Sequence, residues 1–262
     1  MRALHTAATG MMAQEVNVQV ISNNIANMRT TGYKRQRAEF QDLLYEHVSR
    51  IGTQTSTQGN ILPVGIDLGG GVKTVGTPRL MTQGTILPTG GDLNIAIRGE
   101  GFFKVLMPDG TFTYTRDGSF LMDAQGRVVT AQGNVVQPGI TIPANAQSIS
   151  ISPQGQVSAL LPGASSSTVL GQFVLTRFVN KAGLQAIGDN LFVETPASGT
   201  PPDGTPNADG YGDLQQGNLE QANVEAVTEI SDLIAAQRAY EMNGKVITAA
   251  DQMLSSTSNL MR

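Results

Sequence analysis

The chain has 262 residues and a formal net charge of −4, and 40% of its residues are hydrophobic but only 5% are aromatic. It is long enough for one or two domains with a sizeable core, which must be mainly aliphatic. Lys34, Arg35 and Arg37 form the only close group of basic residues. Because binding to nucleic-acid phosphates requires clustered positive charge, we expect no nucleic-acid partner. The absence of cysteine excludes disulfides and thiolate metal sites.

The sequence shows neither a cleavable signal peptide nor a membrane-spanning segment. Its first residues, MRALHTAATGMMAQEV, lack the continuous apolar stretch of a secretory signal. Nowhere do about 18 apolar residues follow one another, so we expect no transmembrane helix. Any export of this chain must therefore depend on another signal.

Segment 1–32 is predicted to be mainly a helix with an apolar seam. A heptad register places seven apolar residues in eight positions: Leu4, Ala7, Met11, Gln14, Val18, Ile21, Ile25 and Met28. Glu15 is the only charged residue between Ala3 and Met28, whereas an ordinary solvated helix face carries several charges. The segment ends in SNNIANMRTTGYK, whose many uncharged polar groups can be buried only if hydrogen bonds satisfy them.

Segment 33–83 is predicted to be an extended connection with short strands. Its larger part, residues 49–81, is rich in Gly, Thr and Gln and shows no helical period. A loop of about 30 residues without structure is unusual inside a compact domain. We therefore expect residues 49–81 to have a function of their own.

Segment 84–221 is predicted to be a mostly antiparallel β domain. Short β-prone runs between residues 102 and 130 alternate with Pro108-Asp109-Gly110, Asp117-Gly118 and Asp123-Ala124-Gln125-Gly126. Such Asp-Gly punctuation is typical of hairpin turns. Residues 195–213, rich in Pro, Gly and Asp, are expected to form a surface loop without strand or helix.

Segment 222–262 is predicted to be a second long helix, from about Ala222 to Thr257, with two apolar stripes. The first stripe consists of Ile230, Leu233, Tyr240, Ile247 and Leu254. The second consists of Ala235, Ala239, Met242, Val246, Ala249, Met253 and Leu260. The early turns carry Glu225, Glu229 and Asp232, where the helix dipole favours negative charge.

Two arrangements of the terminal helices follow from these stripes. If one stripe packs against the N-terminal helix, the other needs a partner from a further copy of the chain. Alternatively, both helices cover the sheet of one globular core. From the two stripes we infer the first arrangement, in which the terminal helices are poorly ordered in a single chain and become ordered when several copies pack together.

No catalytic, cofactor or metal site is expected. His5 and His47 lie in different segments and lack the spacing of a metal or catalytic motif. The glycines at 69–71 and 99–101 do not continue as phosphate-binding fingerprints, so we interpret them as turns or bulges. Asp109, Asp117 and Asp123 do not match a calcium loop and fit hairpin turns.

Four stretches of the sequence resemble signatures of the bacterial flagellar rod and hook proteins. They are ANMRTTGYK at 26–34, GGDLNIAIRGEGFF at 90–103, YTRDGSF at 114–120 and QRAYE at 237–241. The chain is most similar to the distal rod members in its length, in Arg35-Gln36-Arg37 to Leu43-Leu44-Tyr45 and in residues 49–81. Two departures are Asn94, where relatives often carry Asp, and Gly244, which interrupts the second helix.

The resemblance implies a fold and a function. It implies an α+β protein whose terminal helices pair as a coiled-coil-like core around an export channel, with the β domain outside. It further implies a structural subunit, not an enzyme, of a hollow helical driveshaft, the distal rod, that transmits motor torque to the hook. A proximal rod or hook subunit is the alternative.

The resemblance also implies partners and a location. The implied partners are further copies of the chain, proximal rod proteins, the hook protein, outer-membrane and peptidoglycan ring proteins, and the type III export apparatus. The implied location is the basal-body rod, which crosses the periplasm after export without a cleaved signal peptide.

This interpretation predicts an assembly interface between copies. On the N-terminal side it comprises Leu4, Met11, Val18, Ile21, Asn23, Asn24, Ile25, Asn27, Thr31, Gly32 and Tyr33. On the C-terminal helix it comprises Ile230, Leu233, Tyr240, Met242, Val246, Ile247, Met253 and Leu254. We expect the asparagines and threonines to satisfy polar groups at crowded contacts between copies, and residues 49–81 to reach a neighbouring subunit.

Overall fold

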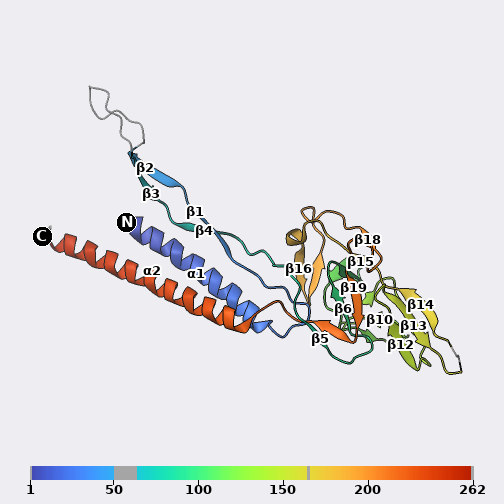
Figure 1. Cartoon of the computed structure of the whole chain (residues 1–262). Helices are drawn as coiled ribbons and strands as arrows, with labels where there is room; N and C mark the ends of the chain where they lie inside the picture. Colours follow the sequence, from blue (N-terminus) through green and yellow to red (C-terminus); the bar gives the residue numbers. More distant parts are fainter. Residues whose placement is uncertain (1, 50–63, 164–165, 261–262) are drawn as a thin grey trace. The chain divides into compact units, whose positions relative to one another are not determined.

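The computed structural model describes residues 2–49, 64–163 and 166–260. Their contacts divide the chain into two compact units (Figure 1). The helical unit contains Met1–Ile25, Gln36–Pro78 and Glu225–Arg262, and the β unit contains Ala26–Arg35 and Arg79–Val224. We describe each unit by itself, and the predicted four-part division of the chain remains a prediction.

Two long helices, α1 (Arg2–Ala26) and α2 (Ala226–Leu260), run antiparallel in the helical unit (Figure 1). Near the end of α1, Asn24 Nδ2 donates to Glu229 Oε2 at the start of α2, at 3.1 Å. Further along the pair, a methyl group added to Gly10 would lie 2.8 Å from Asn243 Nδ2. The buried side chains are mostly small or aliphatic: Ala7, Ala13, Val20 and Ile21 on α1, and Ala236 and Ala250 on α2.

The rest of the helical unit is a hairpin in two steps, which we call the hairpin arm. It consists of β1 (Glu39–Asp42), β2 (Tyr45–Ser49), β3 (Ile66–Gly69) and β4 (Val72–Gly76). β1 pairs with β4 and β2 with β3, both antiparallel. Arg2 forms an ion pair with Glu46 at 2.6 Å, and Val72 N donates to Thr9 Oγ1, so two contacts fix the arm to α1.

The β unit contains only antiparallel strand pairs among its described residues. The largest sheet has the order β16-β17-β8-β7-β11-β10-β9, with β15 on β7 and β18 on β15. The members of this sheet are β7 (Phe102–Leu106), β8 (Phe112–Thr115), β9 (Leu121–Met122), β10 (Val128–Val129), β11 (Val135–Val136), β15 (Leu175–Thr176), β16 (Gln185–Gly188), β17 (Leu191–Val193) and β18 (Asp203–Gly204).

Smaller ladders complete the β unit. β12 (Ser148–Ile151), β13 (Gln156–Leu160) and β14 (Thr168–Gln172) form a three-stranded sheet. β6 (Ile95–Arg98) pairs with β19 (Asp213–Gln216), and β5 (Ile86–Pro88) pairs with β20 (Asn218–Glu220). A short 3-10 helix, η1, spans Lys181–Gly183. The strand pairs β5–β20 and β6–β19 therefore join segments that lie far apart in the sequence.

Two hydrophobic clusters stabilise the β unit. The larger is mainly aliphatic, as predicted, and its Phe103 meets Phe120 edge to face, with 4.9 Å between the ring centroids. The smaller is largely aromatic and consists of Phe102, Tyr114, Phe178, Leu184 and Phe192. Burial of the Tyr114 phenol, which donates to Glu194 Oε2 at 3.2 Å, raises its pKa above the ordinary value.

The predicted hairpin turns are only partly confirmed. Asp109-Gly110 joins β7 to β8, and the Asp123–Gly126 turn joins β9 to β10. The hairpin prediction for Asp117-Gly118 is wrong, because β8 pairs with β7 and β17 rather than with β9. Gly118 instead packs against the backbone of Ile95, whose carbonyl oxygen leaves no space for a side chain. The glycine is required for a close approach and not for a reversal of direction.

The ends of several predicted elements also differ from the structure. α1 ends at Ala26, so Met28 lies in the turn after the helix, and α2 begins at Ala226 rather than at Ala222. The loop predicted at 195–213 contains β18, which is fixed because Asp203 accepts hydrogen bonds from Lys104 and Thr176. No described helix is both long and apolar enough to span a membrane.

Candidate assembly surfaces and a buried ionic cluster

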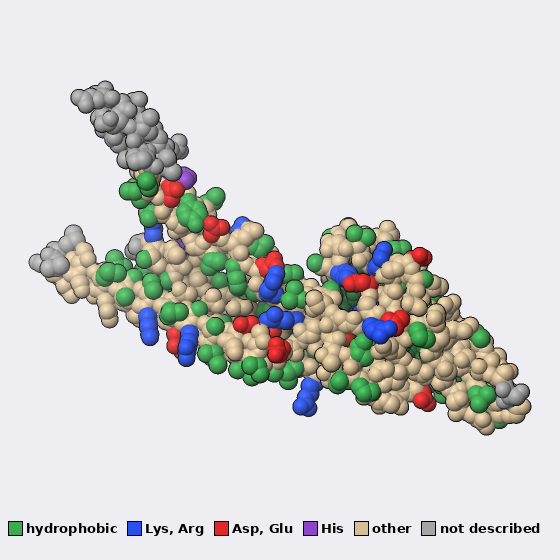
Figure 2. Space-filling model, in the orientation of Figure 1, with side chains coloured by type: hydrophobic (Ala, Val, Ile, Leu, Met, Phe, Trp, Pro, Cys, Tyr) green, Lys and Arg blue, Asp and Glu red, His purple; other side chains and the backbone are tan. Residues whose placement is uncertain are grey.

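Large apolar side chains remain exposed along α2. Met242 is 60% exposed and Met253 is 64% exposed. The exposed set on this helix is Val227, Ile230, Ile234, Tyr240, Met242, Val246, Met253 and Leu254. Figure 2 shows hydrophobic side chains at the surface of both the helical pair and the hairpin arm. Since monomeric proteins rarely expose large continuous apolar patches, this surface indicates a site of protein contact.

The buried seam of α2 differs from both predicted stripes. It consists of residues seven apart, Glu229, Ala236, Asn243 and Ala250, of which Asn243 is half-buried. Leu233 and Ile247 of the first stripe are half-buried beside this seam, whereas Ile230, Tyr240 and Leu254 are exposed. A search for large apolar residues missed the seam because two of its members are alanine and two are polar.

The second predicted stripe is largely exposed, as a stripe that needs a further partner would be. Met242, Val246 and Met253 are exposed, and so are the alanines 235 and 249. Of the predicted interface residues on the α1 seam, Ile21 is buried and Leu4, Met11, Val18 and Ile25 are half-buried. α1 therefore covers only one side of α2.

Asn24 has an intramolecular role. Its side chain is 1% exposed, its Nδ2 donates to Gln36 O at 2.9 Å and to Glu229 Oε2 at 3.1 Å, and its Oδ1 accepts from Gln36 N. Glu229 is fully buried, so its carboxylate does more than complement the helix dipole. We therefore reassign Asn24 from a contact between copies to a contact within the chain.

Gly32 is also used within the chain. Its φ is +68°, and a Cβ at this position would lie 2.7 Å from Asp117 N. Gly32 N donates to Glu220 O at 2.8 Å. Only glycine combines this conformation with this close approach. Of the other predicted contacts in this stretch, Asn23 is exposed, and Asn27, Thr31 and Tyr33 are half-buried.

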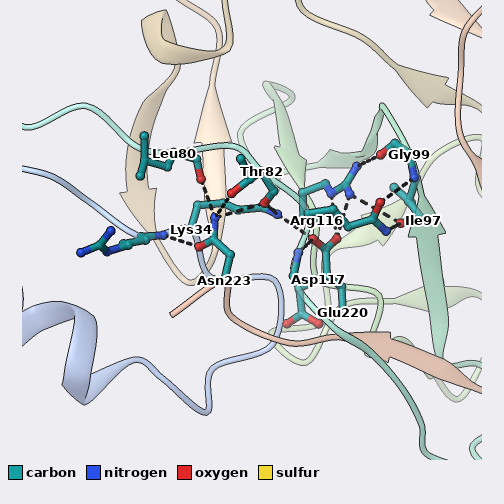
Figure 3. A network of polar contacts seen from close by, with 12 residues as sticks. Lys34, Leu80, Thr82, Ile97, Gly99, Arg116, Asp117, Glu220 and Asn223 are labelled. Atoms are coloured by element: carbon teal, nitrogen blue, oxygen red, sulfur yellow. Dashed lines mark hydrogen bonds and ion pairs between the residues drawn. The ribbon is translucent and has the colours of Figure 1, made fainter. Parts of the chain in front are cut away.

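The β unit contains a buried ionic cluster of Lys34, Arg116 and Glu220 (Figure 3). Lys34 Nζ lies 2.6 Å from Glu220 Oε1, and Arg116 Nη2 lies 2.9 Å from Glu220 Oε2. The side chains of Lys34, Arg116 and Glu220 are 1%, 6% and 0% exposed. One carboxylate thus neutralises part of the charge of two buried cations.

Backbone groups complete the hydrogen bonding of this cluster. Arg116 Nη1 donates to Gly99 O at 2.8 Å and to Gly101 O at 2.7 Å, and Lys34 Nζ donates to Thr82 O at 2.8 Å. Glu220 Oε1 also accepts from Gly84 N at 2.9 Å. The cluster therefore joins four separate stretches of the β unit to Glu220.

Asn223 extends the connections on the C-terminal side of Glu220 (Figure 3). Its Oδ1 accepts from Arg35 N at 2.7 Å, and its Nδ2 donates to Leu80 O at 2.7 Å. Glu220 and Asn223 together fix the stretches at 32–35 and 80–84 against the end of the β unit.

Burial determines the protonation behaviour of Lys34. Removal from water lowers the pKa of Lys34, and the neighbouring Glu220 carboxylate opposes this effect without cancelling it. The sequence around Lys34 does not reveal this burial, because the partner carboxylate lies 186 residues away. Lys34 lies in the ANMRTTGYK stretch and Arg116 in the YTRDGSF stretch, so the family signatures already draw attention to these two residues. Glu220 lies in none of the four signature stretches.

The described residues offer no obvious site for chemistry. They contain no group of three or more His, Asp or Glu that could hold a metal ion. His5 lies exposed on α1, and His47 Nδ1 lies 2.6 Å from Asp67 Oδ1 on the exposed hairpin arm. Both histidines belong to the helical unit, whereas the ionic cluster belongs to the β unit.

Comparison with known proteins gives three family matches along the chain. Residues 4–34 match the model described as flagella basal body rod protein. Residues 96–159 match the D1 domain of the flagellar hook protein FlgE/F/G, and residues 215–260 match the C-terminal part of the flagellar basal body rod FlgEFG protein. The matches include both helices and the core of the β unit.

Two full-length relatives decide the family. The flagellar basal-body rod protein FlgG of Caulobacter vibrioides is 54% identical over 260 residues, which cover 99% of each chain. The FlgG protein of Agrobacterium fabrum is 50% identical over 262 residues, which cover 100% of each chain. The chain belongs to the FlgG family of flagellar basal-body rod proteins. It is a structural subunit of the distal rod and associates with further rod and hook components.

The hook alternative is not favoured. The flagellar hook protein FlgE of Helicobacter pylori is 40% identical over 139 residues, which cover 52% of this chain and 19% of the hook protein. The FlgG relatives instead match from end to end. The similarity to the hook protein is thus that of a shared part and not of the whole chain.

Proposed function

We propose that this FlgG-family chain assembles with copies of itself into a hollow helical driveshaft that transmits torque to the hook. The observation that carries this proposal is the row of exposed large apolar side chains along α2, from Val227 to Leu254. Burying each such side chain contributes roughly 1.5–3 kcal/mol. Within one chain the buried seam of α2 is limited to Glu229, Ala236, Asn243 and Ala250, so a second copy is the partner that covers the exposed row.

The proposed interface is a revision of the predicted set. Its centre is the exposed row, and its margins are the exposed Asn23 and half-buried side chains of the α1 seam and of the turn after α1. The set is Ile230, Tyr240, Met242, Val246, Met253, Leu254, Leu4, Met11, Val18, Ile25, Asn23, Asn27, Thr31 and Tyr33, with Leu233 and Ile247 beside the seam. A contact between two different surfaces propagates as a helix when the rotation does not close a ring.

The hairpin arm supports a second interface between copies. Leu44 is 93% exposed, and Tyr45, Val48, Ile66, Leu68 and Val75 are exposed as well. Two separate interfaces resist twisting better than one. If shear breaks one of them, the other still holds the subunit in place. We expect deletion of residues 53–65 to make the rod flexible or misassembled, and residues 53–63 of this stretch lie outside the described residues.

The finer partners and the location belong to the same proposal. We infer contacts with the outer-membrane and peptidoglycan ring proteins, export by the type III apparatus and a position across the periplasm. We also infer that the chain has no enzymatic activity, cofactor or nucleic-acid partner. The support is membership of a structural rod family together with a net charge of −4.

A single substitution on the exposed row tests the assembly proposal. Met242→Asp changes a side chain that is 60% exposed, so we expect the single chain to fold as before. An unpaired carboxylate within an interface opposes association. We expect the concentration needed for polymerisation, measured by sedimentation, to rise about tenfold or more.

The matched control is Gln252→Asp, which introduces the same charge at an exposed polar position of α2. This variant should polymerise at the concentration of the unmodified protein. Normal polymerisation of Met242→Asp, with rods of normal appearance by electron microscopy, would refute the proposed interface.

A further inference from the structure

The last strands of the β unit complete its interior. Leu214 of β19 is 1% exposed in the main core and lies opposite Ile97 of β6. Ile95 and Ile97 are themselves fully buried, and in the described sheets β6 has β19 as its only strand partner. Arg98 and Asp213, which pair at the end of this ladder, are 115 residues apart. An early buried strand therefore depends on a much later segment.

The ionic cluster adds an electrostatic dependence on the same late segment. Lys34 and Arg116 lose their water when the β unit closes, and Glu220 is the carboxylate that pairs with both. A buried charge whose partner is removed strongly destabilises a fold. The closed β unit is therefore strongly disfavoured while Glu220 is elsewhere.

We propose that Glu220 acts as a completion lock: the β unit closes only after residues 213–223 have joined the stretches at 32–35 and 80–84. Gly84 makes the fit strict, since a Cβ there would lie 2.0 Å from Gln221 O. A chain that emerges with its N-terminus first keeps its β unit open until the last helix begins to emerge. The lock is a property of the single chain, and only its use, delayed folding during export, rests on the proposed function.

Native-state hydrogen exchange of the full chain tests the lock. In the unmodified protein, the slowest amides of β6 and β7 should open together with those of β19 and β20, with one shared free energy. Glu220→Gln keeps the shape of the side chain but removes its charge. We expect the exchange of all four strands to accelerate together by about a hundredfold or more.

Glu100→Gln is the matched control. Glu100 is 49% exposed and pairs with Lys181 in the same unit, so its loss should leave exchange nearly unchanged. If Glu220→Gln accelerates exchange in β19 and β20 while β6 and β7 stay protected, the lock is refuted.

A triple variant keeps the test decisive if Glu220→Gln fails to fold. Replacing Lys34, Arg116 and Glu220 by methionine substitutes apolar packing for the ionic cluster, a change that buried ion pairs often tolerate. We expect this chain to fold and its β19 and β20 amides to exchange about tenfold faster than those of β7, because closure no longer needs Glu220. A single shared opening in this variant would overturn the proposal. The hydrogen-exchange results do not depend on polymerisation. Failure of the completion lock can therefore be distinguished from failure of the proposed assembly interface, which Met242→Asp tests.

Discussion

Lys34 is a cation that the β unit holds away from solvent. Its side chain is 1% exposed, and its ammonium group lies 2.6 Å from Glu220. Buried ion pairs often add little net stability compared with apolar side chains of similar size. The Lys34–Glu220 pair instead fixes the position of the chain segments, because the ammonium group finds its hydrogen-bond acceptors only where Glu220 and Thr82 O converge.

The titration of Lys34 gives a prediction with a defined sign. Its ordinary pKa of 10.5 applies to the unfolded chain, whereas burial lowers its pKa in the folded chain. Between these two values the unfolded state binds more protons, so the free energy of unfolding increases with pH. Lys34→Met should be about 3 kcal/mol less stable at neutral pH. The difference from the unmodified protein should widen as the pH rises towards 10.5.

Urea denaturation at several pH values measures this difference. Lys245→Met, at an exposed position of α2, is the control for the loss of one lysine charge from the surface. A constant difference for Lys34→Met would mean that its pKa is the same in the folded and unfolded chain.

At the scale of elements, α2 is a long helix with little packing in the single chain. It has 35 residues, yet Glu229, Ala236 and Ala250 are its only fully buried side chains among those described. Alanines contribute little apolar area, so the stability of this helix depends strongly on its intrinsic propensity. Gly244 weakens it further, and no atom lies within 4 Å of the place that its Cβ would take.

We therefore expect Gly244→Ala to stabilise the helical unit by about 1 kcal/mol, because alanine is the better helix former and meets no neighbour. Ala249→Gly, at an exposed position of the same helix, should destabilise it by a similar amount. Thermal denaturation followed by helical circular dichroism measures both changes. If neither variant changes the transition, this part of α2 is not helical in the single chain.

Elements with local signals could be predicted from the sequence. The apolar heptad, with Glu15 as the only charge between Ala3 and Met28, predicts α1, and the turns Asp109-Gly110 and Asp123–Gly126 predict the β7–β8 and β9–β10 hairpins. The exposed stripe through Met242 and Val246 follows from helical periodicity.

Features that depend on distant residues could not be predicted. The same Asp-Gly pair that makes a hairpin turn at 109–110 serves a close backbone contact at 117–118, because Ile95 packs there. The polar role of Asn24 depends on Glu229, which lies 205 residues later. No local pattern distinguishes an asparagine that is buried by its own chain from one that contacts another copy.

At the scale of the molecule, both units carry exposed basic residues. Arg238 and Lys245 are exposed on α2, and Arg98, Arg127 and Arg177 are exposed in the β unit. A protease that cleaves after basic residues therefore reports on each unit separately. A protease cleaves a helical backbone only where the helix opens locally. A helix with few packed contacts opens more readily.

Trypsin should cut the dilute chain after Arg238 and Lys245 before it cuts within residues 79–224. Assembly should slow both cuts, because the neighbouring copy covers α2. Mass spectrometry of timed digests identifies the sites, and the exposed Arg127 in the β unit serves as an internal reference. Equal cleavage of α2 in dilute and assembled protein would contradict burial of this helix between copies.

Both ends of the chain belong to the helical unit, and the β unit is formed by interior segments. The turn at Asp109-Gly110 lies within one of these segments, and no atom lies within 4 Å of the place that a Cβ on Gly110 would take. A foreign peptide introduced there leaves the sequence of α1 and α2 unchanged. The fold thus provides a position for attaching an epitope or a fluorophore to each subunit while both terminal helices keep their sequence.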